Sequence, residues 1–396
     1  GAPLPGPTDQ CLTWRRMSPP RPPRARSGAA SVVLRDGLYL FGGYGGDGRL
    51  DDFHRYDLIA GTWSEVVVEG SARPGPRENN GAVVVDDDED GKVYLFGGYD
   101  GTRWLNDLWV FDIDERKWEC VMDPGEDDTA ADESGHPTIP SRRFGYVSFV
   151  HDGKFVLWGG YDGNKWLNDM YEFHFREKRW ARIEPGEVWP SVRSCPAWAK
   201  DDKHVYIHGG YDGVERKSDF FAFDLHTSTW HEVPCRGTPP SPRYFHSCCL
   251  YGHKMYAYGG YSGSERLSDM HAYDFETGRW SAVEYRDPSA AEPPSGRSSL
   301  VAQVYGNHLH VFGGYNGQVV LNDFYRFRLR PVNVPPARLV RDLGRLVDCP
   351  EFADVVFEVE GRRIHANRAL LAVRSEYFRA MLFGSMEDGA GGWFGG

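Results

Sequence analysis

The chain has 396 residues, a formal net charge of −12 and 40% hydrophobic residues, which is enough material for two domains. It contains no apolar run long enough to span a bilayer and no basic stripe, so we expect neither a membrane span nor nucleic-acid binding. The seven cysteines include no Cys-x-x-Cys pair, which favours reduced thiols in an intracellular protein.

Gly-Gly-Tyr occurs six times, with starts 55, 62, 50, 50 and 54 residues apart. Repeats of about 50 residues are typical of propeller blades. An aspartate follows the second glycine by nine residues in all six repeats, and a tryptophan follows it by 20 residues in five. The arginine of a Pro-x-x-Arg motif precedes the first glycine by 16 residues in five repeats. The repeats begin at Gly42, Gly97, Gly159, Gly209, Gly259 and Gly313.

The first repeat predicts four strands, A to D, at residues 29–34, 38–41, 53–56 and 62–68. These runs are short and rich in β-forming residues, and turn residues separate them. A single sheet of this kind exposes both of its faces, whereas six sheets around an axis bury them. The sequence therefore predicts an all-β, six-bladed propeller.

The last blade is expected to contain both ends of the propeller sequence. Val334 stands where the sixth tryptophan would be, whereas Trp14 lies near the start of the chain. We interpret Trp14 as strand D of the last blade, whose strands A to C come from residues 300–328. The propeller would then extend over residues 10–330, closed by the N-terminal strand.

These markers resemble kelch repeats, which have a Gly-Gly pair, a Tyr/Phe-Asp after strand C and a tryptophan in strand D. Tyr56-Asp57 and Phe111-Asp112 fit the pattern, whereas Phe173-His174 and Phe327-Arg328 depart from it. The resemblance implies the same propeller fold.

The end of the chain has a different periodicity. Residues 331–338 form a Pro-rich linker, and residues 339–386 show two strand patterns followed by two stretches of helical spacing. The stretch from Phe352 to Leu382 resembles the start of a BTB domain, an α/β fold that is truncated here. Residues 387–396 are low-complexity. The resemblance implies a homodimer, with a dimer pocket at Asp354, His365 and Arg368.

A kelch propeller placed before a BTB domain is similar to the leucine-zipper-like transcriptional regulator family. This resemblance implies a substrate adaptor of a cullin-RING ubiquitin ligase, with Ras-family small GTPases as the substrates and a cullin scaffold as the partner. It further implies a cytoplasmic protein, with peripheral attachment to endomembranes such as the Golgi left open. The alternative is a kelch scaffold or cytoskeletal binder with no role in ubiquitination.

A substrate-binding rim follows from the meander. The B–C loops, which hold Gly-Gly-Tyr, and the D–A loops, which hold Pro-x-x-Arg, emerge on the same side of the propeller. Arginine suits the capture of carboxylates, and Trp and Arg are enriched in binding hot spots. The arginines and tyrosines could equally support their own blades, and both roles stay open. The candidate rim residues are Arg26, Arg77, Arg143, Arg193, Arg243, Arg297, Tyr99, Tyr161, Trp104 and Trp166.

Two short matches to cofactor- and metal-binding motifs lack the sequence context that those motifs require. Gly43-x-Gly45-x-x-Gly48 matches a dinucleotide fingerprint, but it leads into a strand rather than a helix. Asp86-x-Asp88-x-Asp90 begins like an EF-hand loop but lacks the final glutamate. Some kelch-type propellers are copper oxidases, but this sequence shows no recognisable copper set. We therefore expect no enzyme activity, no catalytic residues, no metal and no cofactor.

Overall fold

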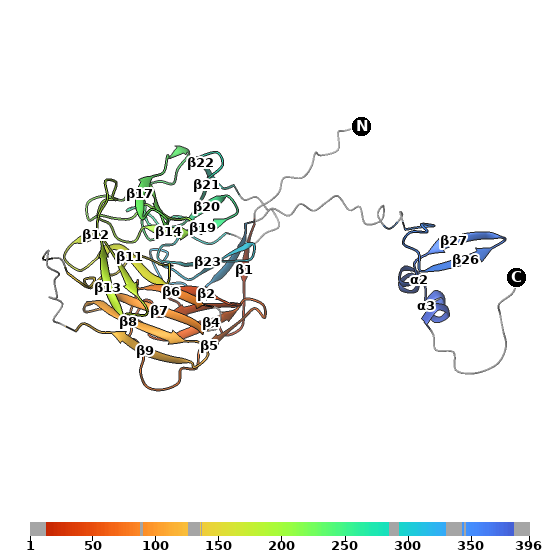
Figure 1. Ribbon diagram of the computed structural model, residues 1–396, viewed down its shortest axis with the longest axis horizontal. Coiled ribbons are helices and arrows are strands. Elements are labelled where there is room, and N and C mark those ends of the chain that lie inside the picture. The colour runs from red at the N-terminus through yellow and green to blue at the C-terminus, as the bar shows by residue number, and fades with distance from the viewer. Residues whose placement is uncertain are drawn as a thin grey trace. The chain divides into compact units, whose positions relative to one another are not determined.

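The computed structural model describes residues 13–87, 90–125, 135, 137–284, 293–329, 343 and 346–383. The chain divides into two compact units, residues 1–331 and 332–396. The first unit is a propeller of six sheets around one axis (Figure 1), which confirms the predicted fold. The predicted linker at 331–338 and the low-complexity tail at 387–396 lie outside the described residues.

Each blade is an antiparallel meander of four strands, and the strands follow one another in chain order except in blade six. Blade one contains β2 (Ala30–Leu34), β3 (Gly37–Phe41), β4 (Phe53–Asp57) and β5 (Thr62–Glu65). Blade two contains β6 (Gly81–Asp87), β7 (Asp90–Tyr99), β8 (Trp104–Asp112) and β9 (Lys117–Met122). Blade three contains β10 (Val147–His151), β11 (Lys154–Tyr161), β12 (Trp166–His174) and β13 (Arg179–Ile183).

The second half of the ring repeats this arrangement, with a short extra strand on the edge of blade five. Blade four contains β14 (Ala197–Lys200), β15 (His204–His208), β16 (Phe220–Asp224) and β17 (Thr229–Glu232). Blade five contains β19 (Ser247–Tyr251), β20 (Lys254–Tyr258), β21 (Met270–Asp274) and β22 (Arg279–Ala282), with β18 (Arg236–Gly237) parallel to β22. Blade six contains β23 (Val301–Tyr305), β24 (His308–Phe312), β25 (Phe324–Arg328) and β1 (Trp14–Met17).

Blade six closes the ring from the two ends of the propeller sequence. Strand β1 pairs antiparallel with β25, with Trp14 opposite Phe327. The indole of Trp14 is 3% exposed and lies 5.0 Å from the ring of Tyr258 in blade five and 4.9 Å from that of Phe327. The predicted closure by an N-terminal strand is therefore confirmed.

The strand-D tryptophans form the contact between neighbouring blades. Trp63 of blade one lies 5.2 Å from Phe312 and 5.8 Å from Phe324, both in blade six. Strand B is buried along its whole length in blade one, because neighbouring sheets cover both of its faces. The six tryptophans at this position are 2–6% exposed, and they are Trp14, Trp63, Trp118, Trp180, Trp230 and Trp280.

The aspartate after strand C stabilises the next turn. In blade one, Asp57 Oδ1 accepts hydrogen bonds from the backbone N–H groups of Ile59 and Ala60 at 3.0 and 2.7 Å. This is the local hydrogen bonding that favours aspartate in turns. His174 and Arg328 stand at the equivalent positions in blades three and six, and both blades still form strand C.

The second unit has the predicted order of two strands and two helices. A hairpin of β26 (Val355–Val359) and β27 (Arg362–Ala366) precedes α2 (Arg368–Arg374) and α3 (Glu376–Phe383). Asn367 caps α2, since its side chain accepts a hydrogen bond from Leu370 N–H. Several large apolar side chains of this unit are at least 48% exposed, and they are Val347, Phe352, Val356, Val359, Val373, Tyr377, Met381 and Phe383.

Candidate functional site

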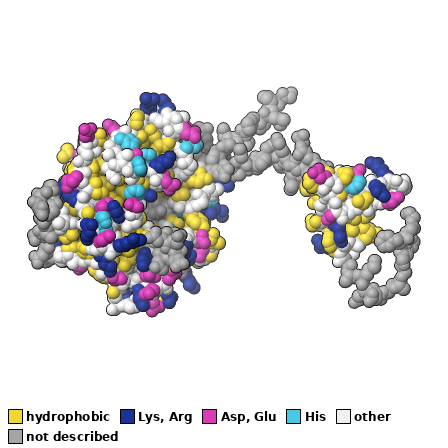
Figure 2. Space-filling view, in the orientation of Figure 1, with side chains coloured by type: hydrophobic (Ala, Val, Ile, Leu, Met, Phe, Trp, Pro, Cys, Tyr) yellow, Lys and Arg dark blue, Asp and Glu magenta, His cyan; other side chains and the backbone are white. Residues whose placement is uncertain are grey.

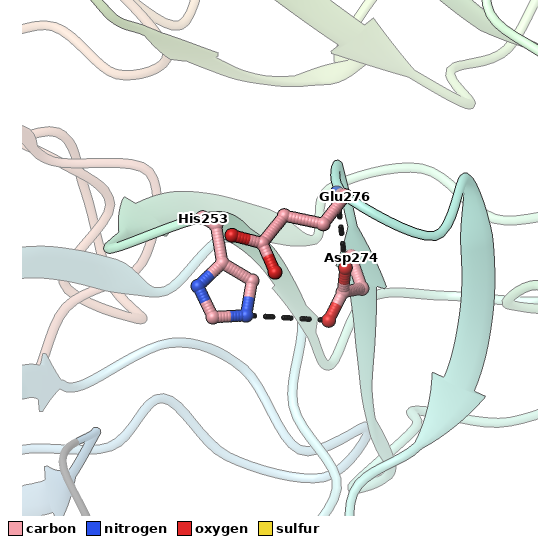
Figure 3. Close-up of side chains that lie close together, drawn as sticks. All are labelled: His253, Asp274 and Glu276. Carbon is pink, nitrogen blue, oxygen red and sulfur yellow. Dashed lines mark hydrogen bonds and ion pairs between the residues drawn. The ribbon is translucent and has the colours of Figure 1, made fainter.

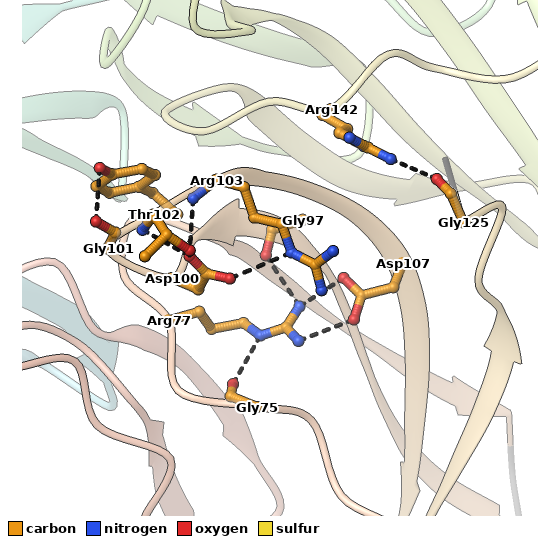
Figure 4. A network of polar contacts seen from close by, with 11 residues as sticks. Gly75, Arg77, Gly97, Asp100, Gly101, Thr102, Arg103, Asp107, Gly125 and Arg142 are labelled. Carbon is orange, nitrogen blue, oxygen red and sulfur yellow. Dashed lines mark hydrogen bonds and ion pairs between the residues drawn. The ribbon is translucent and has the colours of Figure 1, made fainter. Parts of the chain in front are cut away.

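The six Pro-x-x-Arg arginines lie inside the propeller. In blade two, Nη1 and Nη2 of Arg77 donate to the two carboxylate oxygens of Asp107 at 2.7 and 2.8 Å (Figure 4). Nη1 also donates to the carbonyl of Gly97, and Nε donates to that of Gly75. The same bidentate pair recurs in every blade, and we call it the inner ring. Its pairs are Arg26–Asp52, Arg77–Asp107, Arg143–Asp169, Arg193–Asp219, Arg243–Asp269 and Arg297–Asp323.

The inner ring joins three parts of the repeat. Arg143 stands in the D–A loop, Asp169 lies within strand C (β12), and the accepting carbonyl belongs to Gly159, the first glycine of the pair. Burial alone would raise the pKa of Asp169, but the guanidinium of Arg143 holds that pKa below its ordinary value. The aspartate nine residues after the glycines is therefore explained as the partner of the arginine.

This geometry assigns the six arginines to support of their own blades. Their residues are at most 2% exposed, and four or five of the guanidinium donors in each already have acceptors within the blade. Of the two roles that the sequence left open, the structure shows the supporting one, and it places none of these arginines on the accessible surface of the rim.

A ring of backbone hydrogen bonds surrounds the mouth of the central channel. The second residue after each inner-ring arginine has φ between 51° and 65°. Its N–H donates to the carbonyl of the equivalent residue in the preceding blade at 2.6–3.1 Å, and the last link joins Gly28 to Ser299. We call this closed ring the collar. Its members are Gly28, Asn79, Gly145, Cys195, Phe245 and Ser299.

Below the collar lies a channel with a cavity volume of 460 Å³. It is lined largely by the strand-A residues of the blades, including Ala30, Ser148 and Cys248. The buried side-chain amide of Asn80 and the Nδ1 atom of His246 also line it, and neither has a hydrogen-bond partner within the described residues. Water is the ordinary partner of such buried polar groups.

A pair of buried histidines lies beside this channel. His208 Nδ1 is 3.0 Å from His246 Nε2, and both side chains are buried. Burial, together with the nearby positive charge of Arg243, lowers the pKa of His208 to about 3. Burial likewise lowers the pKa of His246 well below its ordinary value, so both imidazoles are neutral at pH 7.

The tyrosines of Gly-Gly-Tyr form the outer part of the rim. Each hydroxyl donates to the carbonyl two residues further on, at 2.6–2.9 Å, so the tyrosines hold their own B–C loops. Tyr99 and Tyr161 are partly buried in this arrangement. The six tyrosines are Tyr44, Tyr99, Tyr161, Tyr211, Tyr261 and Tyr315.

Trp104 and Trp166 fill the spaces between these tyrosines. Trp104 lies 4.8 Å from Tyr99 of its own blade and 5.7 Å from Tyr161 of the next. Trp166 lies 4.5 Å from Tyr161 and 5.6 Å from Tyr211. The structure therefore brings together all four of the aromatic residues predicted for the rim, and each retains an accessible part.

Both tryptophans occupy the sixth position after the second glycine, and the side chain at this position packs toward the next blade. Arg49 contacts the rings of Tyr44 and Tyr99, each at 4.9 Å. We call the six tyrosines and these six side chains the belt. In order of blades, the side chains of the sixth position are Arg49, Trp104, Trp166, Arg216, Arg266 and Val320.

The sequence reasoning missed the arginines of the belt. It selected arginines because they recur in every repeat, and the arginines of the sixth position recur in only three of six. A column-by-column alignment of the repeats would have found them, because it puts Arg216 and Arg266 in register with Trp104 and Trp166.

The predicted BTB dimer-pocket residues fall into two places in the second unit. The carboxylate of Asp354 accepts from the backbone N–H of Arg368 at 2.6 Å. The guanidinium of Arg368 lies 4.8 Å from the ring of Phe383. His365 instead contacts Asp348, whose carboxylate accepts from the backbone N–H of His365 at 2.9 Å. These contacts stabilise the hairpin and the start of α2, and the dimer pocket remains a prediction.

One group of side chains has the composition of a metal site. His253, Asp274 and Glu276 lie on blade five with their ligand atoms within 4.8 Å of one another (Figure 3). His253 Nε2 is 3.3 Å from Asp274, whose carboxylate also accepts hydrogen bonds from the backbone N–H groups of Glu276 and Thr277. The turn therefore accounts for Asp274, and no second observation indicates a metal.

The surface of the propeller mixes both signs of charge. Figure 2 shows basic and acidic side chains interspersed over the face in view, without a continuous basic stripe on that face. Within the described residues, no helix is long and apolar enough to cross a membrane. The cysteines that the structure describes are free, and they are Cys120, Cys195, Cys235, Cys248, Cys249 and Cys349.

Comparison with known proteins supports both units. Residues 8–137, 129–235 and 185–333 match the family model of the KLHDC2/KLHL20/DRC7 Kelch-repeats domain, and residues 343–390 match the BTB/POZ domain. The leucine-zipper-like transcriptional regulator 1 homolog of Drosophila melanogaster is 29% identical over 92% of this chain and 32% of its own length. Leucine-zipper-like transcriptional regulator 1 of Homo sapiens is 24% identical over 83% of this chain and 38% of its own length.

The chain thus spans between 32% and 38% of the length of these two relatives. Kelch domain-containing protein 3 of Mus musculus is 28% identical over 43% of this chain and 44% of its own length. The glycine pairs, the aspartates after strand C and the strand-D tryptophans are the residues that carry the kelch pattern in the structure. With the family match extending over residues 8–333, the chain belongs to the kelch-repeat family and has a partial BTB domain after its propeller.

Proposed function

We propose that this protein is a substrate-recognition adaptor of a cullin-RING ubiquitin ligase. One observation carries the proposal, namely that a kelch propeller and a BTB domain occur in one chain. The propeller would bind the protein substrate on its belt, and the BTB domain would form a dimer and bind the cullin scaffold. Ubiquitin transfer would be accelerated because the adaptor holds the substrate close to the ligase. The two propellers of one dimer would also bind a substrate with added avidity.

The belt supports this role better than the channel does. It is partly accessible and combines aromatic rings with guanidiniums, which are the groups enriched in binding hot spots. We place the substrate there and propose Ras-family small GTPases as the substrate class, from the resemblance to the leucine-zipper-like relatives. We further propose a cytoplasmic location and no catalytic activity of the chain itself.

The test is co-purification of the full gene product, tagged and expressed in its own cells. A cullin scaffold is expected in the eluate at near-equal amounts, and a small GTPase is expected to be enriched with it. A folded, dimeric protein that brings down no cullin would contradict the adaptor role. Actin filaments in place of a cullin would favour the alternative, a cytoskeletal scaffold.

A further inference from the structure

The belt contains three guanidiniums in equivalent places, so the repeats can be compared with one another. Arg49, Arg216 and Arg266 each lie between the tyrosine of their own blade and that of the next. The guanidinium carbon of Arg216 is 5.3 and 5.8 Å from the two ring centroids, and that of Arg266 is 3.9 and 5.0 Å. Such contacts hold a guanidinium in one plane without neutralising its charge.

The first of these arginines has a carboxylate partner. Nε and Nη2 of Arg49 donate to the same oxygen of Glu78 at 2.9 and 2.6 Å. Glu78 is the residue directly after the inner-ring arginine of blade two, and its side chain is only 14% exposed. Arg49 therefore shows the geometry of the sixth position when a carboxylate neutralises its arginine.

Arg216 lacks that partner. The residue equivalent to Glu78 in blade five is Tyr244, which is an aromatic residue. The nearby carboxylates of Asp212 and Glu215 are both paired with Lys217 at 2.7 Å. No carboxylate of the described residues pairs with Arg216, and its buried Nε atom has no hydrogen-bond partner among them. Its remaining donors likewise have no acceptor within the part of the chain that the structure describes, which leaves them available to a ligand.

Arg266 shows the same deficit. The equivalent residue in blade six is Ser298, whose hydroxyl is 3.4 Å from Nε of Arg266. That neutral contact is the one hydrogen bond of the Arg266 guanidinium to the described residues. Two neighbouring blades therefore each hold an oriented, uncompensated positive charge on the rim of a protein whose net charge is −12.

We propose that Arg216 and Arg266 bind the carboxylates of an acidic protein segment that lies across blades four to six. The segment would supply to each guanidinium what Glu78 supplies to Arg49. Val214, which is 87% exposed in the same B–C loop, would contact an apolar residue of that segment. The inference rests on the proposed function only because it takes the belt as the substrate site. It goes further by naming the blades that bind the substrate and the acidic side chains that they select.

The first experiment measures fluorescence anisotropy of three labelled peptides of equal length, hexaglutamate, hexaglutamine and hexalysine, with the full chain. Hexaglutamate is expected to bind at least tenfold more tightly than hexaglutamine. Its binding should weaken as salt rises, because the contact is a partly exposed ion pair. Equal binding of hexaglutamate and hexaglutamine would overturn the proposal.

The second experiment identifies the residues. The double variant Arg216→Gln/Arg266→Gln is expected to lose the preference for hexaglutamate. The control Arg35→Gln/Asp114→Asn, which removes an exposed ion pair outside the belt, is expected to keep it. Circular dichroism and urea midpoints equal to the parent's show that both proteins are folded. Loss of the preference in the control alone would overturn the assignment.

These measurements are independent of the ligase role. A protein that binds no cullin but prefers hexaglutamate through Arg216 and Arg266 would contradict the adaptor proposal alone. A protein that binds a cullin but shows no preference would contradict this inference alone. A phosphoserine peptide that outcompetes hexaglutamate at equal charge would overturn the choice of carboxylate as the ligand.

Discussion

The inner ring and the belt use arginine in opposite ways. Arg143 of the inner ring is buried, and Asp169 neutralises it through two hydrogen bonds. Arg216 of the belt is half-buried and lies between two tyrosines, and no carboxylate of the described residues pairs with it. The inner position is arginine in all six blades, whereas the sixth position is arginine in three, tryptophan in two and valine in one.

This difference matches the proposed division between support and recognition inside one molecule. A group that every blade needs for its own folding must recur in every blade. A single ligand is asymmetric and contacts the blades unequally, so the residues that select it are free to differ between repeats. We therefore expect substitutions in the repeated positions to change the free energy of unfolding and those at the sixth position of the belt to change binding.

Trp14 is the strongest test of this rule, because it is a repeated residue that lies far from its blade in sequence. Trp14→Ala removes a buried indole between blades five and six and is expected to lower the free energy of unfolding by about 3–5 kcal/mol. Urea denaturation monitored by circular dichroism measures this. A loss confined to the edge of blade six, with the other blades unchanged in hydrogen exchange, would contradict ring closure as a global stabiliser.

Arg143→Ala breaks a buried pair and leaves Asp169 without its partner, so a loss of about 3–5 kcal/mol is expected. The comparison substitution Arg216→Gln removes a guanidinium with no carboxylate partner in the described residues and is expected to change stability by less than about 0.5 kcal/mol. Urea midpoints of the two variants measure the contrast. Equal destabilisation would remove the distinction between inner ring and belt.

Gly163→Ala tests how tightly the belt is packed. Gly163 has φ +97°, and an added Cβ would lie 2.5 Å from the Trp104 ring. The backbone strain amounts to about 1–2 kcal/mol, and displacement of Trp104 adds to it. Gly153→Ala is the matched control, since Gly153 also has a positive φ, +64°, but has open space at its Cβ. If thermal melts show the same fall in melting temperature for both variants, Trp104 moves aside without cost.

The neutral histidine pair predicts a pH dependence. The pKa of His208 is about 3 in the folded protein and about 6.5 in an unfolded chain. The unfolded state therefore binds more protons, and the contribution of His208 to stability falls as pH drops from about 6.5 towards 3, by about 1.4 kcal/mol per pH unit. The lowered pKa of His246 acts in the same direction. Urea midpoints at pH 7.5 and 5.5 measure this.

The repeats suggest the control for that experiment. Phe312 and Leu300 occupy the positions of His208 and His246 in blade six. The double variant His208→Phe/His246→Leu should retain the fold and lose most of the decline between pH 7.5 and 5.5. An unchanged decline would assign it to other groups.

Periodicity was sufficient to predict the fold, including the closure by Trp14, because four markers in fixed phase leave few arrangements. It predicted the side of the propeller on which the arginines and glycines emerge. It did not show that each arginine meets the aspartate 26 residues later, or 30 in blade two, since that contact depends on how the D–A loop folds over strand C. The role of the belt arginines could not be predicted from the repeats alone. It depends on their contact with the next blade and on which residue stands at the position of Glu78.

The closure of blade six has a consequence for synthesis on the ribosome. Strand β1 leaves the exit tunnel first, yet its partner β25 begins at Phe324, roughly 310 residues later. At about 5–20 residues per second, the N-terminal strand waits roughly 15–60 s for its partner. During that interval the edges of the first and the newest blade are open to pairing with other chains. Newly made copies of this protein therefore have unpaired sheet edges until the last blade has been translated.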